Sequence, residues 1–303
     1  MSRSYSVSSR SKSSVFMRPS FRDSSTSHSY NTMERFYCEK VPMTSIVMSD
    51  LVRLVTSCGG YAKQQRHQLA VTRKSDGSLV TNIDQAVEAQ IVAYLRTNHP
   101  THAILGEEGT FVGDQNLANH EFLWVIDPID GTSAFAGGLT GWCVGIGLVH
   151  YGKPYAGFVY APMSEELYVA TPDGLALRNE QPIHVSTTPT IQLDDWMAVP
   201  SDMHRKYDIN YHGRVRTTGA TIMSMCYVAA GMASAALIGS CKAWDIAPAL
   251  ALVHNAGAEL WGLDGQIVDL STLLHPDAKT PTMICAPQDQ FQFYRNTIEK
   301  IEY

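Results

Sequence analysis

The chain has 303 residues, of which 45% are hydrophobic and 17% are charged, so it can bury a sizeable core as one large domain or two smaller ones. The net charge of −6 argues against a nucleic-acid partner, and no apolar run approaches the ~20 residues that a membrane-spanning helix needs. The six cysteines are scattered without a CxxC pair, so we expect neither structural zinc nor a disulfide framework, and a reducing compartment such as the cytoplasm.

The first 32 residues differ in composition from the rest of the chain. Thirteen of the first 29 residues are serine, five are basic, and no acidic residue precedes Asp23. A segment of this kind cannot bury enough apolar surface to offset its chain entropy, so residues 1–32 are predicted to be a disordered tail. Such starts also resemble organelle transit peptides, and serines beside arginines suit phosphorylation, so both roles stay open. The folded part is expected to begin near Met33.

Residues 33–184 are predicted to form an α+β subdomain that binds metal. Apolar side chains at helical spacing predict helices over residues 44–66 and 82–98, and the turn-forming pair Asp76-Gly77 lies between them. The predicted strands that follow are "HAILGEEG" (102–109), "FLWVID" (122–127), a hairpin over 141–162 that turns at Gly152-Lys153-Pro154, and "EELYVA" (165–170).

Residues 185–303 are predicted to form an α/β subdomain that completes the active site. "DWMAVP" (195–200) reads as a strand, and "ATIMSMCYVAAGMASAAL" (220–237) as one apolar helix rich in small residues. A further helix is predicted over "WDIAPALALVHNAG" (244–257), with Asp245 as its N-cap and Pro248 in its first turn. Strands mixed with helices, followed by strands that alternate with helices, favour an α+β half joined to an α/β half.

The stretch "WVIDPIDGTSAF" places two carboxylates, Asp127 and Asp130, directly after an apolar strand. Pro128 fixes the backbone between them, so both side chains and the Ile129 carbonyl can point into one pocket. Carboxylates gathered in this way repel one another unless a cation lies between them. Mg²⁺ takes oxygen ligands of this kind and keeps some of its waters while it binds a substrate phosphate. The sequence therefore predicts a magnesium site at the end of this strand.

Other acidic residues also stand at the ends of predicted elements: Glu107 and Glu108, Asp245, and Asp84. Each has a purely structural explanation, as a solvated strand end, a helix N-cap or a second cap. Asp127 and Asp130 could likewise do no more than brace a turn. Their occurrence together, each beside small residues and tight turns, favours a shared site. Gly131 and Thr132 would then open a helix whose free N–H groups suit a phosphate.

The motifs "GEE", "DPIDGT" and "WDIAPA", in this order, resemble those of the inositol monophosphatase family of Mg²⁺-dependent, lithium-sensitive phosphatases. The resemblance covers nearly everything after Met33 and includes "SDGSLVTNID" and "RTTGAT". It implies a layered αβαβα sandwich of two subdomains, an active site between them, and a homodimer.

The resemblance also implies which residues hold the metal ions. The ligands are Glu107, Asp127 and the Ile129 carbonyl for a first Mg²⁺, Asp127, Asp130 and Asp245 for a second, and Asp84 for a weaker third. Two such ions can neutralise a phosphate monoester, lower the pKa of a bound water and stabilise the leaving alkoxide.

The same resemblance implies the catalytic and substrate-binding residues. Thr132 would orient the attacking water together with Glu107, and Asp84 is a further catalytic candidate. The residues expected to contact the substrate are Gly131 and Thr132 at the phosphate, and Gly219, Ala220 and Thr221 at the alcohol.

Substrate identity is less determined than the chemistry. Where animal inositol monophosphatases carry a glutamate that binds inositol hydroxyls, this chain has Ile238. Ser240 and Lys242 lie in the same segment, which leads to Asp245. A 3′(2′),5′-bisphosphate nucleotidase, a fructose-1,6-bisphosphatase and a histidinol-phosphatase are alternatives, because a fold does not decide among them. An inactive scaffold with a partner-binding tail is a remote alternative, because all the expected ligands are present.

Overall fold

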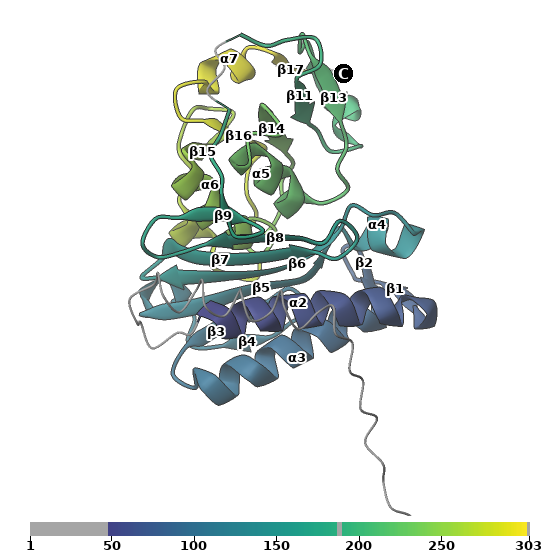
Figure 1. Ribbon diagram of the computed structural model, residues 1–303, viewed down its shortest axis with the longest axis vertical. Helices are drawn as coiled ribbons and strands as arrows, with labels where there is room; N and C mark the ends of the chain where they lie inside the picture. Colours follow the sequence, from purple (N-terminus) through teal and green to yellow (C-terminus); the bar gives the residue numbers. More distant parts are fainter. Residues whose placement is uncertain (1–47, 187–189, 302–303) are drawn as a thin grey trace, which may run out of the picture.

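The computed structural model describes residues 48–186 and 190–301. The predicted tail of residues 1–32 and the first residues of the predicted helix, 44–47, lie outside this part. Five layers of helix and sheet alternate through the described residues, from α2 and α3 at the bottom of Figure 1 to α7 at the top. This arrangement is the αβαβα sandwich that the resemblance implies.

The first layer consists of the helices α2 (Met48–Gln65) and α3 (Asn82–Asn98), both confirmed from the sequence pattern. Each buries one apolar stripe, and Leu51, Val55 and Ile91 have no exposed surface. Full burial of such a side chain contributes about 1.5–3 kcal/mol. Helix α3 begins with a capping box, in which the Thr81 side chain accepts from the first-turn backbone and Asp84 accepts from the Thr81 backbone N–H.

The second layer is an eight-stranded sheet whose strand order is β10-β9-β8-β7-β6-β5-β3-β4. Every neighbouring pair is antiparallel except β3 and β5, which are parallel. The strands are β3 (Ala103–Gly106), β4 (Phe111–Val112), β5 (Phe122–Asp130), β6 (Cys143–His150), β7 (Lys153–Ala161), β8 (Glu166–Ala170), β9 (Ala176–Arg178) and β10 (Gln181–Pro182). Helices cover both faces of this sheet, so the central strands are continuous apolar runs.

The third layer consists of α5 (Thr221–Ala229) and α6 (Ala247–Ala256), which lie between the two large sheets (Figure 1). The fourth layer is a five-stranded sheet in the order β13-β11-β14-β16-β15. Its strands are β11 (Trp196–Ala198), β13 (Arg214–Arg216), β14 (Ala235–Ile238), β15 (Ala258–Gly262) and β16 (Met283–Pro287). The short helix α7 (Phe291–Arg295) packs on its outer face through the fully buried Tyr294.

Two small elements complete the frame around the candidate site. Strands β1 (Val71–Arg73) and β2 (Leu79–Thr81) form a hairpin, and its turn contains Gly77 at φ 87°. The turn predicted at Asp76-Gly77 is therefore confirmed. Helix α4 (Thr132–Gly137) begins directly after β5, as predicted for Thr132.

The sequence prediction was wrong about residues 220–237, which do not form one helix. Helix α5 ends at Ala229, Gly231 turns the chain at φ 65°, and Ala235–Ile238 continue as the buried strand β14. Short runs of small apolar residues fit a buried strand as well as a buried helix, so periodicity alone does not separate them.

The prediction of Asp245 as an N-cap was also wrong. Helix α6 begins at Ala247, its N-cap is Ile246, and the Asp245 carboxylate instead accepts from the Lys242 backbone N–H at 2.6 Å. The hairpin turn lies earlier than predicted, because β6 ends at His150 and β7 already begins at Lys153. None of the described helices has the length and apolar character that crossing a membrane requires.

Candidate active site

A cavity of about 520 Å³ opens where β5, β3 and the start of α6 meet, and we call it the carboxylate cavity. The side chains of Asp127, Asp130 and Asp245 bring ligand oxygens within 4.8 Å of one another there. The complete lining is Arg73, Gly77, Ser78, Leu79, Glu107, Asp127, Ile129, Asp130, Gly131, Thr132, Ser133 and Asp245.

The end of β5 explains how two of these carboxylates reach the same cavity. The pairing of β5 with β6 shifts register between Asp127 and Asp130. Such an irregularity re-aims side chains that a regular strand would direct to alternate faces. Asp127 and Asp130 are 1% and 5% exposed, so their charges lie inside the protein.

Asp127 carries the strongest indication of a cation site. Neither of its carboxylate oxygens has a hydrogen-bond partner within residues 48–186 and 190–301. Burial raises the pKa of Asp127 well above its ordinary value, and the charges of Glu107 and Asp130 raise it further. A buried carboxylate without partners is costly, and a bound cation removes that cost. The donor set is all oxygen, which fits a hard divalent ion such as Mg²⁺.

Asp130 and Asp245 are each tied to a backbone N–H as well as facing the cavity. Asp130 accepts from Thr221 at 3.2 Å and from Ile222 at 2.5 Å, so it also receives the first N–H groups of α5. Burial raises the pKa of Asp130, and the charge of Asp245 adds to the effect. Burial likewise raises the pKa of Asp245 to about 6, although its bond from Lys242 opposes the shift.

Glu107 lines the same cavity but is paired with a cation from the β1–β2 hairpin. The Lys74 ammonium lies 2.8 Å from a carboxylate oxygen of Glu107 and 2.8 Å from one of Glu108. Burial raises the pKa of Glu107 to about 7, while Lys74 acts in the opposite direction. Lys74 therefore supplies positive charge to the Glu107-Glu108 pair, beside the three aspartates.

Glu88 holds the turn that carries these glutamates. It projects from α3, is 3% exposed, and accepts from the backbone N–H groups of Glu108 at 2.8 Å and Thr110 at 3.2 Å. Its carboxylate is so close to the turn that a Cβ on Gly106 would lie 2.6 Å from it. Hydrogen bonds to a charged acceptor are the stronger ones, so Glu88 positions Glu107 through the backbone.

Asp84 lies behind the cavity and reaches it through Thr132. The Thr132 hydroxyl is 3.0 Å from a carboxylate oxygen of Asp84 and 3.1 Å from the Ile129 carbonyl, either of which can accept its hydrogen. Asp84 has no exposed surface, and this burial raises its pKa. Thr132 is expected to orient a water together with Glu107, and both line the same cavity, while the direct contact of the Thr132 hydroxyl is with Asp84.

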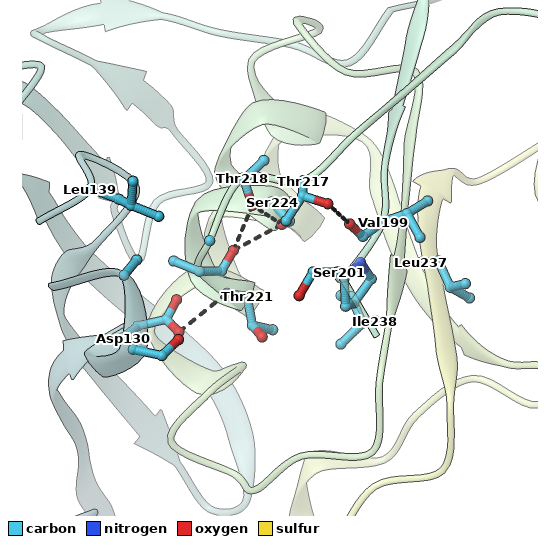
Figure 2. A pocket seen from close by; sticks show the side chains of 15 residues that line it. Asp130, Leu139, Val199, Ser201, Thr217, Thr218, Thr221, Ser224, Leu237 and Ile238 are labelled. Carbon is cyan, nitrogen blue, oxygen red and sulfur yellow. Dashed lines mark hydrogen bonds between the residues drawn. The ribbon is translucent and has the colours of Figure 1, made fainter. Parts of the chain in front are cut away.

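A smaller pocket of about 310 Å³ adjoins the carboxylate cavity at Asp130, and we call it the neutral pocket. Figure 2 shows Asp130 at one end and Val199, Ser201 and Ile238 toward the other. Its lining is Asp130, Ser133, Ala134, Leu139, Val199, Pro200, Ser201, Thr217, Thr218, Gly219, Ala220, Thr221, Ser224, Leu237 and Ile238. Asp130 is thus the one formal charge in a lining whose other residues are hydroxyl-bearing, small or apolar.

Two glycine contacts bring loops of the two large sheets together between these cavities. Gly131 has φ 88°, a left-handed conformation that suits glycine, and a Cβ there would lie 2.8 Å from the Gly219 carbonyl oxygen. A Cβ on Gly141 would lie 1.8 Å from the Thr218 carbonyl oxygen. The loop before α5 therefore rests on bare backbone beside α4.

The predicted site residues divide into three groups in space. Asp127, Asp130 and Asp245 converge, Glu107 shares their cavity, and Asp84 stands behind Thr132. The predicted substrate residues Gly219, Ala220 and Thr221 line the neutral pocket, with Ile238 in the same wall. Lys242 and Ser240 are turned to other partners, the carbonyls of Pro276 at 2.5 Å and Thr280 at 2.6 Å.

Sequence reasoning missed Lys74, Arg73 and Glu88. The first two belong to "RKSDGS", whose composition indicates a turn, although adjacent cations before a turn are also a usable signal. Glu88 gives no local signal, because a single glutamate in an amphipathic helix normally faces solvent.

Comparison with known proteins places the chain in a family. A model described as the inositol monophosphatase family matches residues 45–302. The chain is 35% identical over 231 residues to Phosphatase IMPL1, chloroplastic, of Arabidopsis thaliana, an alignment that spans 68% of this chain and 61% of that protein. It is 30% identical over 218 residues to inositol monophosphatase 1 of Bos taurus, spanning 66% of this chain and 76% of the relative.

Solved structures share the fold of this chain. The IMPase of Thermotoga maritima superposes with a TM-score of 0.72 at 23% identity, over 82% of this chain and 95% of that one. SaIMPase-II of Staphylococcus aureus, solved with bound 2′AMP, gives a TM-score of 0.67 at 25% identity, over 83% and 94%. The chain therefore belongs to the inositol monophosphatase family, a family of metal-dependent phosphatases.

Proposed function

We propose that the protein hydrolyses phosphate monoesters in the carboxylate cavity with Mg²⁺ as its metal. The observation that carries this proposal is the buried Asp127 carboxylate, whose two oxygens lack a hydrogen-bond partner in the described chain while Asp130 and Asp245 stand beside it. Asp127, Asp130, Asp245, Glu107 and the Ile129 carbonyl would hold the ions, with Asp84 near a weaker third. Bound there, Mg²⁺ supplies charge neutralisation for the phosphate and acidifies water.

The chain's own residues then orient the water and take its proton. The hydrogen of the Thr132 hydroxyl is directed to Asp84 or to the Ile129 carbonyl, at 3.0 and 3.1 Å. Its oxygen therefore faces the cavity as an acceptor for a water hydrogen. Asp84 is buried with a raised pKa, so it can receive the proton that Thr132 passes on. Glu107, which lines the same cavity, would orient the water together with Thr132.

The phosphate is placed by the first turn of α4. The first N–H groups of a helix have no partner within the helix and carry a partial positive charge. Gly131 and Thr132 stand at this turn and line the carboxylate cavity, so they can contact the phosphate oxygens. Arg73, which belongs to the β1–β2 hairpin, adds positive charge to the lining of the same cavity.

The alcohol part of the substrate would occupy the neutral pocket. Ile238 in its wall cannot accept hydrogen bonds from ring hydroxyls, so we propose broad monoester activity in which inositol phosphate is accepted without a sharp preference. Nucleoside 2′-phosphates are the second candidate class, since the Staphylococcus aureus relative was solved with bound 2′AMP. A homodimer, lithium inhibition and a cytoplasmic location are further parts of this proposal.

Phosphate release from a panel of esters tests the function. Inositol 1-phosphate, glycerol 2-phosphate, adenosine 2′-phosphate, fructose 1,6-bisphosphate and histidinol phosphate are assayed with Mg²⁺ and with EDTA. We expect release that needs Mg²⁺ and that differs only modestly between the small monoesters. Release that persists unchanged in EDTA, or none from any ester at millimolar Mg²⁺, would contradict the proposal.

A further inference from the structure

Asp245 reaches the carboxylate cavity on residues 239–246, which join β14 to α6 and which we call the Asp245 segment. None of these described residues belongs to a helix or a strand, whereas Asp127 and Asp130 stand on β5. A ligand on an irregular segment is placed only as well as the contacts that hold the segment. Those contacts come from residues 274–282, which lead into β16 and which we call the clamp loop.

Thr280 of the clamp loop extends the pairing of β14 with β16 beyond the end of both strands. The last paired residues are Ile238 and Met283, and Cys241 and Thr280 each stand three residues further along in the same register. The Thr280 backbone N–H donates to the Cys241 carbonyl at 2.9 Å, as in a regular antiparallel ladder. The return bond is different, because the Cys241 N–H donates at 2.9 Å to the Thr280 hydroxyl instead of the Thr280 carbonyl. That carbonyl accepts from the Ser240 hydroxyl at 2.6 Å.

The next peptide along the chain carries this contact to the metal site. The Lys242 N–H donates to the Oδ2 atom of Asp245 at 2.6 Å. Consecutive N–H groups, those of Cys241 and Lys242, are therefore bound to Thr280 and to the Asp245 carboxylate. Because peptide units are planar and stiff, a shift of the first N–H group also displaces the second. The clamp loop holds the Lys242 side chain as well, whose Nζ donates to the Pro276 carbonyl at 2.5 Å.

Thr280 is placed to act on Asp245 through the backbone alone. It is 3% exposed and lines neither the carboxylate cavity nor the neutral pocket. Its hydroxyl oxygen also lies 3.4 Å from the Cys241 Sγ atom. A valine in its place would keep the shape of the side chain but leave the Cys241 N–H without its acceptor, and an N–H group that loses its partner inside a protein is costly.

We infer that Thr280 is a positioning residue for the metal site. Its hydroxyl fixes the start of the Asp245 segment and so sets how tightly the carboxylate cavity binds a divalent cation. The inference rests on the proposed function, in which Asp245 is a ligand of Mg²⁺. Groups that orient a ligand from behind typically change metal affinity by about 10–100-fold when they are removed.

Calorimetric titration with Mg²⁺ alone, without substrate, tests this role. We expect the Kd for Mg²⁺ to rise about 10-fold in Thr280→Val, and Thr280→Ser, which keeps the hydroxyl, to stay within about twofold of the wild type. The kcat of Thr280→Val at saturating Mg²⁺ should remain near that of the wild type, because all the carboxylates are present. An unchanged Kd in Thr280→Val would overturn the inference.

Thr171 provides a matched control for the loss of a buried hydroxyl. It is 1% exposed, and in the turn between β8 and β9 it makes the same pair of bonds with Leu175. Its N–H donates to the Leu175 carbonyl at 3.0 Å, and its hydroxyl accepts from the Leu175 N–H at 3.1 Å. Thr171→Val should lower the Tm about as much as Thr280→Val and leave Mg²⁺ affinity unchanged. An equal loss of affinity in both variants would show general loosening and overturn the inference.

Hydrogen exchange in the metal-free protein tests the route from Thr280 to Asp245. NMR should show the Lys242 amide exchanging about 10-fold faster in Thr280→Val, and the Leu175 amide faster only in Thr171→Val. A loss of Mg²⁺ affinity while Lys242 keeps its protection would exclude the backbone route and overturn the inference.

The same measurements separate this inference from the function it rests on. If the wild type binds Mg²⁺ and Thr280→Val binds it equally well, the positioning role fails alone. If the wild type binds no Mg²⁺ at millimolar concentration, the proposed metal fails. Faster exchange of Lys242 in Thr280→Val would then still support Thr280 as the residue that holds the Asp245 segment, and unchanged exchange would overturn that role too.

Discussion

The carboxylate cavity and the neutral pocket share Asp130 and yet differ in almost every physical property. The first concentrates buried carboxylates, and burial raises the pKa of Asp127, Asp130, Asp245 and Glu107. The second offers hydroxyls, small residues and apolar side chains. The carboxylates of the carboxylate cavity repel one another when ionised, and a bound cation is what stabilises them together. The carboxylate cavity is therefore restricted to metal-dependent chemistry. Nothing comparable restricts the second, so substrate choice can vary while the reaction stays the same.

Removing one charge from the carboxylate cavity should produce the largest effect. Asp127→Asn keeps the shape of the side chain but removes the charge of the carboxylate that we propose both ions share, so we expect kcat/KM to fall by roughly 10³-fold or more. Mg²⁺ affinity, measured by calorimetry, should fall with it, while circular dichroism stays unchanged. The exposed Asp173→Asn is the matched control and should keep full activity. Turnover of the Asp127 variant at ordinary Mg²⁺ would remove the metal from the mechanism.

Substitution of Thr132 tests whether its hydroxyl orients the attacking water. Thr132→Ala removes the hydroxyl that contacts Asp84 and leaves every carboxylate in place. We expect kcat to fall on the order of 10²–10⁴-fold with little change in KM, the size typical of acid–base positioning. Thr132→Ser, which keeps the hydroxyl, should recover most of the rate. A raised KM with an unchanged kcat would assign Thr132 to substrate binding instead.

The pH dependence of protein stability should reveal the buried carboxylates of the carboxylate cavity, which the neutral pocket lacks apart from Asp130. The pKa of Glu107 is about 7 against an ordinary 4.5, and that of Asp245 about 6 against 3.8. Because folding raises these values, the stabilising contribution of their protons is complete below about pH 4 and is lost as pH rises through 6 to 7.

A thermal melt series in EDTA measures this effect. From pH 5 to pH 8 we expect the free energy of unfolding to fall on the order of a few kcal/mol, since each pKa unit corresponds to about 1.4 kcal/mol. Saturating Mg²⁺ should flatten the series, because the ion stabilises the ionised carboxylates. A metal-free Tm that rises over this range would contradict the assignment of buried, uncompensated charge.

Adding a carboxylate to the neutral pocket tests whether the residues of this pocket determine substrate choice. Ile238→Glu should improve kcat/KM for inositol 1-phosphate relative to glycerol 2-phosphate by about 1–3 kcal/mol, the size of a charge-assisted hydrogen bond. Ile238 is 1% exposed, so Ile238→Leu serves as the packing control and the Tm of both variants is recorded. A wild type that already selects inositol phosphate sharply, and that the glutamate does not improve, would mean that another residue contacts the ring.

The smallest effect is expected at Glu88, which touches neither cavity. Glu88→Gln keeps the volume but weakens the bonds from Glu108 and Thr110, so Glu107 is held less firmly. We expect the Mg²⁺ concentration for half-maximal activity to rise about 10-fold, with kcat at saturating Mg²⁺ near that of the wild type. Glu88→Asp, which keeps the charge, should recover part of this loss. A fall in kcat that Mg²⁺ does not restore would indicate a general folding defect.

The sequence predicts the carboxylate cavity better than the pockets beside it. Asp127, Asp130 and Asp245 stand in short motifs whose spacing and turns by themselves indicate a cation site. The neutral pocket draws on Val199, Thr217 and Ile238, which are ordinary residues that only the pairing of β11 with β13 and β14 brings together. Register between distant strands is set by packing, so no local pattern contains it.

The same limit explains the errors in secondary structure. Helices α2 and α3 were predicted within a few residues because one face of each meets solvent and the apolar period is visible. The segment 220–237 is largely buried, and its alanines conceal the change from α5 to β14 at Gly231. The roles of Lys74 and Glu88 were not predicted, because the partners of both residues lie in the turn after β3, far along the chain.

The bare backbone contacts at Gly131 and Gly141 have a mechanical consequence. Loops from the two large sheets touch there without side chains between them, so there is no compressible layer through which one sheet could slide over the other. The carboxylates at the end of β5 and the neutral-pocket residues before α5 are therefore held in fixed registration. A new specificity is therefore expected from exchanging side chains around the neutral pocket. A methyl group added at Gly131 or Gly141 would instead push apart the loops that carry the two cavities.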